Sequence, residues 1–184
     1  MNNLLLHACC GPCTVYPVTL LRKDGFDVTA YAYNPNIHPY REFKKRLTTL
    51  KTYAGNISLP ILGDSKYGLT EFIRKVAFNE KERCEICYIT RLEETARMAS
   101  DNHFDSFTTT LLYSKYQNHK LIKKICDSLA EKYDISFLYH DFREGWQEGI
   151  DSSIALDMYR QPYCGCIYSE QERYDKSLRK KKNL

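Results

Sequence analysis

The stretch LLLHACCGPCTVYP, residues 4–17, joins a short apolar run to a segment with helical spacing. Residues 3–8 are apolar on both faces, which predicts a buried strand, and residues 14–23 predict a helix that stops before Gly25. The remaining sequence continues this alternation. We expect strands at residues 28–33, 58–62, 104–110 and 135–140, and helices at residues 40–54, 69–76, 89–100 and 118–133.

Alternating strands and helices predict an α/β fold with a mostly parallel sheet flanked by helices. After Asp141 the pattern becomes irregular, with a short helical segment to Tyr159 and a turn-rich, cysteine-containing stretch. We expect a single domain over residues 1–175 and a basic tail over residues 176–184. Cys9, Cys10, Asn34 and residues 108–112 follow predicted strands, so one site at the carboxyl edge of the sheet can gather them.

Composition narrows the class of protein. The chain has 184 residues, of which 43% are hydrophobic and 27% charged, and this excludes general disorder. No apolar run approaches the roughly 20 residues of a membrane span, and the N-terminal residues lack the features of a secretory signal. We therefore expect a cytoplasmic protein with no membrane partner, whose cysteines bind metal or perform redox chemistry.

Seven of the eight cysteines fall into three groups, and only Cys126 stands alone on the apolar face of a predicted helix. Cys10 and Cys13 have the spacing of a thioredoxin-like dithiol, with Cys9 as an additional thiol. The second group, Cys84 and Cys87, supplies two thiolates to one metal or cluster. Together with Cys9 and Cys10 it provides four thiolates, a number that suits zinc or a 4Fe-4S cluster equally.

The third group is Cys164-Gly-Cys166. Glycine permits the unusual backbone that a disulfide or a two-thiol metal clip needs at this spacing. Such a small-ring disulfide is easily reduced, which suits an electron relay, and zinc ligation is the alternative.

Aromatic and basic residues near the C-terminus predict contact with nucleic acid. The chain has fifteen tyrosines, and four near the C-terminus interleave with Arg160 and Arg173; the tail carries Lys180, Lys181 and Lys182. Aromatic rings and cations together stack bases and hold phosphates, although core packing and a solvated chain end explain them equally well. His38, Tyr116 and His119 follow predicted strands and are candidate proton donors, for which scaffold or capping roles are the alternative.

Six ordered segments resemble the QueH-type epoxyqueuosine reductases, and the resemblance extends from Leu4 to about Glu172. These segments are HACCGPC, YNPNIHPYREFKKR, RCEICYITRLEETA, TTLLYSKYQNH, FREGWQEG and YRQPYCGCIYSE. The resemblance implies a cytoplasmic enzyme with a HUP/Rossmann-like fold that reduces epoxyqueuosine to queuosine at the wobble position of tRNA. HACCGPCT stands where ATP-using members of this fold group have a phosphate loop, so we expect no use of ATP.

The resemblance also implies roles for individual residues. It assigns a 4Fe-4S cluster to Cys9, Cys10, Cys84 and Cys87, and a redox-active disulfide to Cys164 and Cys166. A second, mononuclear iron or zinc ion is implied near the cluster, with Cys13 as a possible ligand or an incidental thiol. We expect the cysteine pair and the cluster to act together, with Tyr116, His119 or His38 as proton donor and an unidentified electron donor as partner.

Two other functions remain compatible with the residues themselves. One is a zinc-stabilised RNA-binding module without redox activity. The other is a thioredoxin-like dithiol oxidoreductase that acts through Cys10 and Cys13. Iron content and disulfide-reducing activity distinguish the three.

Overall fold

A computed structural model of the chain describes residues 2–63 and 66–180. Its centre is a five-stranded sheet in the order β3-β2-β1-β4-β5, and every strand pair is parallel. The strands are β1 (Asn2–His7), β2 (Phe26–Tyr31), β3 (Ile61–Leu62), β4 (Ser106–Thr109) and β5 (Ser136–Phe137).

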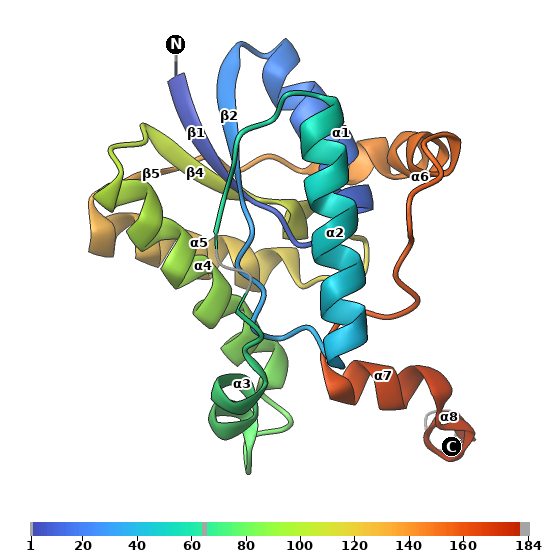
Figure 1. The fold of residues 1–184 in the computed structure, drawn as a ribbon. Coiled ribbons are helices and arrows are strands. Elements are labelled where there is room, and N and C mark those ends of the chain that lie inside the picture. Colours follow the sequence, from blue (N-terminus) through green and yellow to red (C-terminus); the bar gives the residue numbers. More distant parts are fainter. Residues whose placement is uncertain (1, 64–65, 181–184) are drawn as a thin grey trace.

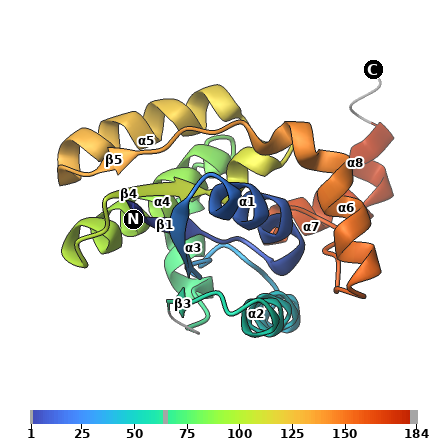
Figure 2. The ribbon, with the colours of Figure 1, turned by 90° about the horizontal axis from the view of Figure 1, so that it is seen from above.

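Helices cover both faces of this sheet, with α1 packed on α2 and α4 packed on α5 on opposite sides (Figures 1 and 2). The larger helices are α1 (Gly11–Lys23), α2 (Tyr40–Asn56), α4 (Arg83–Asp101), α5 (His119–Tyr133) and α6 (Trp146–Ala155). The shorter ones are α3 (Leu69–Val76), α7 (Ile167–Tyr174), α8 (Lys176–Lys180) and the 3-10 turns Thr110–Tyr113 and Phe142–Gly145. The predicted fold class, α/β with a parallel sheet flanked by helices, is confirmed.

The central strand explains why the sheet forms. Leu4, Leu5 and Leu6 are all fully buried, because β1 has neighbouring strands on both sides and helices on both faces. Such a strand reads as a continuous apolar run rather than an alternating one. Its carboxyl end therefore lies in the middle of the sheet edge, where ligands bind in parallel α/β folds.

Three predicted boundaries differ from the structure in ways that concern function. Helix α1 begins at Gly11, so Cys10 is its N-cap residue and Cys13 lies in its first turn. Helix α4 begins at Arg83, six residues before the predicted start, and includes the Cys84/Cys87 pair. Helix α7 occupies part of the segment predicted to be turns, and Cys166 is its N-cap residue.

The C-terminal segment takes no part in the sheet. After α6 the chain runs along the edge of the molecule, passes the first turns of α2 and enters α7 (Figure 1). Among the helices of the described residues, none combines the length and hydropathy that a membrane crossing requires.

Candidate metal and redox site

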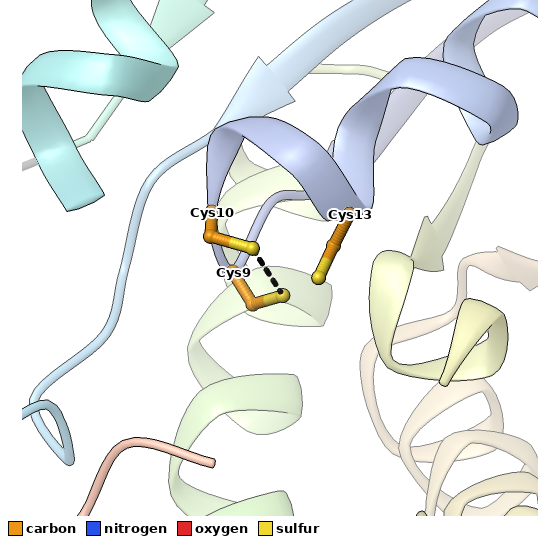
Figure 3. A group of neighbouring side chains, drawn as sticks. All are labelled: Cys9, Cys10 and Cys13. Carbon is orange, nitrogen blue, oxygen red and sulfur yellow. Dashed lines mark hydrogen bonds between the residues drawn. The ribbon is translucent and has the colours of Figure 1, made fainter. Parts of the chain in front are cut away.

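Three thiols meet where β1 passes into α1. The sulfur atoms of Cys9, Cys10 and Cys13 all lie within 4.8 Å of one another (Figure 3). The Cys9 and Cys10 sulfurs are 3.7 Å apart. Two thiolates on one tetrahedral ion, with metal–sulfur bonds of about 2.3 Å, lie at roughly this separation. The cysteine triad, residues 9, 10 and 13, therefore has the spacing of a single-ion site.

The end of β4 fixes this junction. The Cys9 backbone N–H donates to Thr110 Oγ1 at 3.0 Å, and the Thr14 hydroxyl donates to the Cys10 carbonyl at 2.7 Å. At the last residue pair of the β1–β4 register, His7 Nδ1 lies 2.9 Å from Thr109 Oγ1. The thiols are thus held by the two central strands rather than by a free loop.

The three thiols share their protons unequally. Hydrogen bonds from Cys10 and Cys13, and the positive charge of Arg91, hold the pKa of Cys9 well below its usual range. Burial raises the pKa of Cys10, and hydrogen bonds to its two neighbours raise the pKa of Cys13. Ionisation of the triad is thus easiest at Cys9. The Gln161 side-chain amide also donates, to Cys10 Sγ at 3.0 Å and Cys13 Sγ at 3.3 Å.

Arg91 on α4 is a buried cation, only 3% exposed, that lies beside two of the thiol groups. Its Nη1 is 3.7 Å from Cys87 Sγ, its Nη2 donates to Asn34 Oδ1 at 2.8 Å, and its Nε has no hydrogen-bond partner. Within the described residues no carboxylate forms an ion pair with it. Because a buried charge needs a counter-charge, the residues here fit a negatively charged group made of a metal and thiolates.

Cys84 and Cys87 lie outside the triad, in the first turns of α4. Cys84 is exposed, whereas burial raises the pKa of Cys87 to about 12. Both thiols interact electrostatically with Cys164 and Cys166. Cys87 and Cys166 also share a small apolar cluster with two side chains of α3, Phe72 and Val76. The structure thus groups the α4 pair with the C-terminal pair, and Arg91 connects this group to Cys9.

Cys164 and Cys166 are both free thiols in different surroundings. Cys164 is exposed and accepts a hydrogen bond from Gln117 Nε2 at 3.5 Å, whereas Cys166 is buried and accepts one from the Ser169 N–H at 3.4 Å. Between them Gly165 has a φ of +154°, in the region that favours glycine. A residue with a side chain rarely adopts this backbone conformation.

Arg46 on α2 holds this C-terminal segment in place. Its guanidinium donates to the Cys164 carbonyl at 2.7 Å, the Tyr163 carbonyl at 2.9 Å and Glu42 Oε1 at 2.7 Å. Arg46 and Glu42 are both buried, with side-chain exposures of 3% and 8%. Tyr159 donates its hydroxyl to the second oxygen of Glu42. The side chain of Arg46 therefore holds the segment through hydrogen bonds to two of its backbone carbonyls.

One cavity of about 600 Å³ joins these parts. Cys9, Cys13 and Cys164 line it, so thiols of the triad and of the C-terminal pair face the same space. Among the described residues that line it there is no aspartate or glutamate, and there are four arginines, which are Arg46, Arg91, Arg160 and Arg173. A cavity of this size suits a small molecule or a single nucleotide, and its charge favours an anionic ligand.

The predicted proton donors lie in three different places. Tyr116 lines the cavity and is 86% exposed. His38 lies outside the cavity lining with its ring against Tyr67 and Phe72, and burial lowers its pKa to about 4, so it is neutral at pH 7. His119 also lies outside, with its Nε2 3.1 Å from the Ser114 carbonyl. Of the three, only Tyr116 has access to a ligand in the cavity.

The basic tail is described in part. Lys176–Lys180 form α8, next to α7, whereas Lys181 and Lys182 lie outside the described residues.

Sequence reasoning missed Arg46, Arg91 and Gln161. The two arginines belong to predicted amphipathic helices, in which a charged residue ordinarily faces solvent. Glu42 and Arg46 stand four residues apart, but exposed pairs have the same spacing. Gln161 lies in a segment without periodicity and carries no signal at all.

Comparison with known proteins identifies close relatives. A family model described as epoxyqueuosine reductase QueH matches residues 4–172. Curated proteins named epoxyqueuosine reductase QueH include one from Dehalococcoides mccartyi, 36% identical over 95% of this chain and 96% of its own length. Another, from Thermotoga maritima, is 37% identical over 96% of this chain and 94% of its own length.

A solved structure shares the fold at low sequence identity. It is described as a predicted subunit of a tRNA methyltransferase from Methanocaldococcus jannaschii, with a TM-score of 0.56 and 13% identity. The match covers 84% of this chain and 76% of that one. It supports the α/β architecture alone.

Proposed function

Because this chain belongs to the QueH family of epoxyqueuosine reductases, we propose that it reduces epoxyqueuosine to queuosine at the wobble position of tRNA. The observation that carries the proposal is the arginine-lined cavity on which Cys9, Cys13 and Cys164 open. An anionic RNA substrate fits its charge, and thiols of two groups can reach one reacting atom.

The reaction removes one oxygen atom from the substrate. The epoxide accepts two electrons and two protons, both C–O bonds break, a C=C bond forms and the oxygen leaves as water. Two thiols that become a disulfide release two electrons and two protons, which balances the reaction. We propose Cys164 and Cys166 as that pair, with an external electron donor that returns the disulfide to the dithiol. The exposed position of Cys164 on the cavity supports this role.

We further propose that the thiols hold a 4Fe-4S cluster through Cys9, Cys10, Cys84 and Cys87. When bound, such a group supplies electron transfer and a Lewis acid for the epoxide oxygen. The interaction of Arg91 with both Cys9 and Cys87 supports this ligand set, because a buried cation between the two pairs offsets the charge of a thiolate-bound group.

The close spacing of the triad supports a second, mononuclear iron or zinc ion, for which we propose Cys13 as a ligand. It also favours one alternative function, a zinc-stabilised RNA-binding module, because three clustered thiols suffice for a structural zinc ion with one further ligand. Gln161 supports either metal, since its amide donates to two of the three sulfurs.

Anaerobic reconstitution tests the proposal. The protein is supplied with iron, sulfide and a chemical reductant, then incubated with an anticodon stem-loop that carries epoxyqueuosine. We expect loss of one oxygen atom from the nucleoside by mass spectrometry, and about four irons with labile sulfide per chain. A colourless zinc protein without turnover would instead identify the RNA-binding module. Insulin disulfide reduction without iron would identify a dithiol oxidoreductase acting through Cys10 and Cys13.

A further inference from the structure

The mouth of the cavity carries an aromatic pair that the reduction chemistry does not use. Tyr116 follows the 3-10 turn Thr110–Tyr113, and 86% of its surface is exposed. Its ring meets the ring of Trp146 edge-on, with centroids 5.8 Å apart and an interplanar angle of 79°. Both residues line the cavity, so the exposed face of Tyr116 is in contact with the space that the substrate enters.

Neighbouring residues hold Tyr116 and Trp146 in place. Tyr113, which is buried, packs against Trp146 with ring centroids 5.2 Å apart and donates its hydroxyl to the Trp146 carbonyl at 2.9 Å. The Tyr116 backbone N–H donates to Ser114 Oγ at 3.2 Å, and His119 Nε2 lies 3.1 Å from the Ser114 carbonyl. The exposed ring is therefore presented by a fixed loop, which lowers the entropic cost of stacking a ligand on it.

Two cations lie in the region of the aromatic pair. Lys115 Nζ lies 5.7 Å from the centroid of the Trp146 ring, and the exposed Arg160 lines the same cavity. An exposed aromatic face beside cations, with no carboxylate among the described residues of the cavity lining, is the arrangement that binds single-stranded nucleic acid through stacked bases and phosphates. RNA loops present their unpaired bases in this way.

We propose that Tyr116 and Trp146 form a stacking platform for an unpaired nucleobase next to the reacting nucleotide of the RNA substrate. The inference rests on the proposed function and adds a subsite to it. It gives Tyr116 a role in RNA affinity through its ring, in place of proton donation through its hydroxyl. The platform holds the neighbouring base at the rim while the reacting nucleotide occupies the cavity.

Trp146 is the single tryptophan of the chain, so its fluorescence reports on the platform directly. The probe is an unmodified anticodon stem-loop, compared with the same RNA carrying an abasic residue on either side of the wobble position. We expect the intact RNA to quench Trp146. Tyr116→Ala is expected to weaken binding by roughly 5- to 100-fold, the range for loss of one stacked base. Tyr116→Phe keeps the ring and is expected to bind like the wild type.

Tyr139→Ala is the matched control. Tyr139 is also an exposed tyrosine beside a lysine, with Lys123 Nζ 5.8 Å from its ring centroid, but it does not line the cavity. We expect this variant to bind the stem-loop with wild-type affinity. An abasic residue at the stacked position is expected to weaken RNA binding by the wild type. It should cause no further loss of affinity in Tyr116→Ala, because the two changes remove the same contact.

Turnover gives a second readout that separates this inference from the proposed function. On the epoxyqueuosine stem-loop, Tyr116→Ala should raise KM about tenfold and leave kcat unchanged. If Tyr116→Phe loses kcat as Tyr116→Ala does, the hydroxyl is a proton donor and the platform is refuted. Normal RNA affinity of Tyr116→Ala also refutes it, while reduction by the wild type would leave the proposed function intact. RNA binding that depends on Tyr116 without any reduction would support the platform and refute the proposed function.

Discussion

The two ends of the chain hold their thiols in different ways. The N-terminal triad lies at the junction of β1 and α1, at the end of the central strand. Thr110 and Thr14 form hydrogen bonds with its backbone there. Cys164 and Cys166 stand on a segment that has no strand partner. Arg46 bonds two of its carbonyls, and the His38 backbone N–H donates to the Gly165 carbonyl at 2.8 Å.

This difference suits two kinds of chemistry. A metal site needs ligands whose positions do not change, and hydrogen bonds to Thr110 and Thr14 hold the backbone of the triad at the end of the central strand. A dithiol that is oxidised and reduced again in each turnover needs local freedom, and a segment held by side chains can loosen without global unfolding. The comparison therefore predicts that changes at the N-terminal site remove the metal, whereas changes at the C-terminal segment spare it.

The largest expected effect comes from the triad itself. Cys9→Ser removes the thiol whose pKa is lowered and which Arg91 faces. We expect loss of bound iron and of all measurable turnover, with an unchanged far-ultraviolet circular dichroism spectrum because the cysteine is only partly buried. Metal analysis after anaerobic reconstitution checks this. Cys126→Ala, in the core far from the cavity lining, is the control and should keep its iron, and full iron in Cys9→Ser would contradict the ligand assignment.

The next effect separates the two regions. Cys164→Ser and Cys166→Ser should each abolish multiple turnovers, because a single thiol cannot deliver two electrons as a disulfide. The visible absorption of the reconstituted metal group should persist, since neither residue belongs to the proposed ligand set. Turnover and visible absorption spectra, measured on the same preparation, test both expectations. Wild-type turnover in either variant would remove the pair from the reaction.

A smaller effect concerns the attachment of the C-terminal segment. Arg46→Met frees two carbonyls and leaves the Glu42 carboxylate buried without its cation. Breaking a buried pair in this way costs about 3–5 kcal/mol of unfolding free energy. We expect turnover to fall by roughly one to two orders of magnitude, which corresponds to about 1.4–2.7 kcal/mol of lost transition-state stabilisation when Cys164 is no longer held at the cavity. The iron content should fall less than in Cys9→Ser, because Arg46 is not a proposed ligand, although its charge acts on Cys10 and Cys9.

Alkylation rates of Cys164 test the same variant without turnover, because a loosened segment should expose this thiol further. Arg46→Lys keeps one charge and should be intermediate. Arg97→Met is the matched control, since Arg97 forms exposed pairs with Glu94 and Asp101 on α4 and its loss should cost about 0–1 kcal/mol. An unchanged alkylation rate in Arg46→Met would show that other contacts fix the segment.

Lowering the pH should loosen the contacts of the C-terminal segment gradually, through His38. Burial lowers the pKa of His38 to about 4, whereas an unfolded histidine titrates near 6.5. His38 therefore favours the folded state fully above pH 6.5, and this contribution is lost as the pH falls toward 4. Between pH 7.5 and pH 5 the loss is about 2 kcal/mol of unfolding free energy.

His38→Leu should remove this part of the pH dependence, measured as urea unfolding at the two pH values. Burial also lowers the pKa of His7 in β1, to about 3. His7 is unchanged in the variant, so the part of the pH dependence that comes from His7 should persist. Because the peptide groups of His38 bond Gly165 and Tyr163, the alkylation rate of Cys164 relative to that of free cysteine at the same pH should rise on acidification before the metal is lost. Loss of metal first would reverse the order that the comparison predicts.

The same contrast explains what the sequence predicts and what it does not. The apolar run of β1 and the cysteines behind it are local signals, so the strand, the following helix and the sheet class follow directly from them. The grouping of Cys84 and Cys87 with Cys164 and Cys166 depends on how α4 and α7 approach each other. Arg46 and Arg91 are buried only because the C-terminal segment and the thiols cover them, and no local pattern encodes that.

The smallest expected effect lies beyond the C-terminal pair. The tail carries Lys176, Arg179, Lys180, Lys181 and Lys182, and the first three follow α7 as α8. If these cations contact phosphates of the tRNA, removing residues 176–184 should weaken binding at low salt and make the logarithmic salt dependence shallower by about 0.9 for each lost contact. Binding measured at several salt concentrations gives this slope, and kcat should stay unchanged because the thiols are untouched. An identical slope in the truncated and full-length proteins would mean that the tail is solvated and that recognition of the RNA belongs to the cavity and its rim.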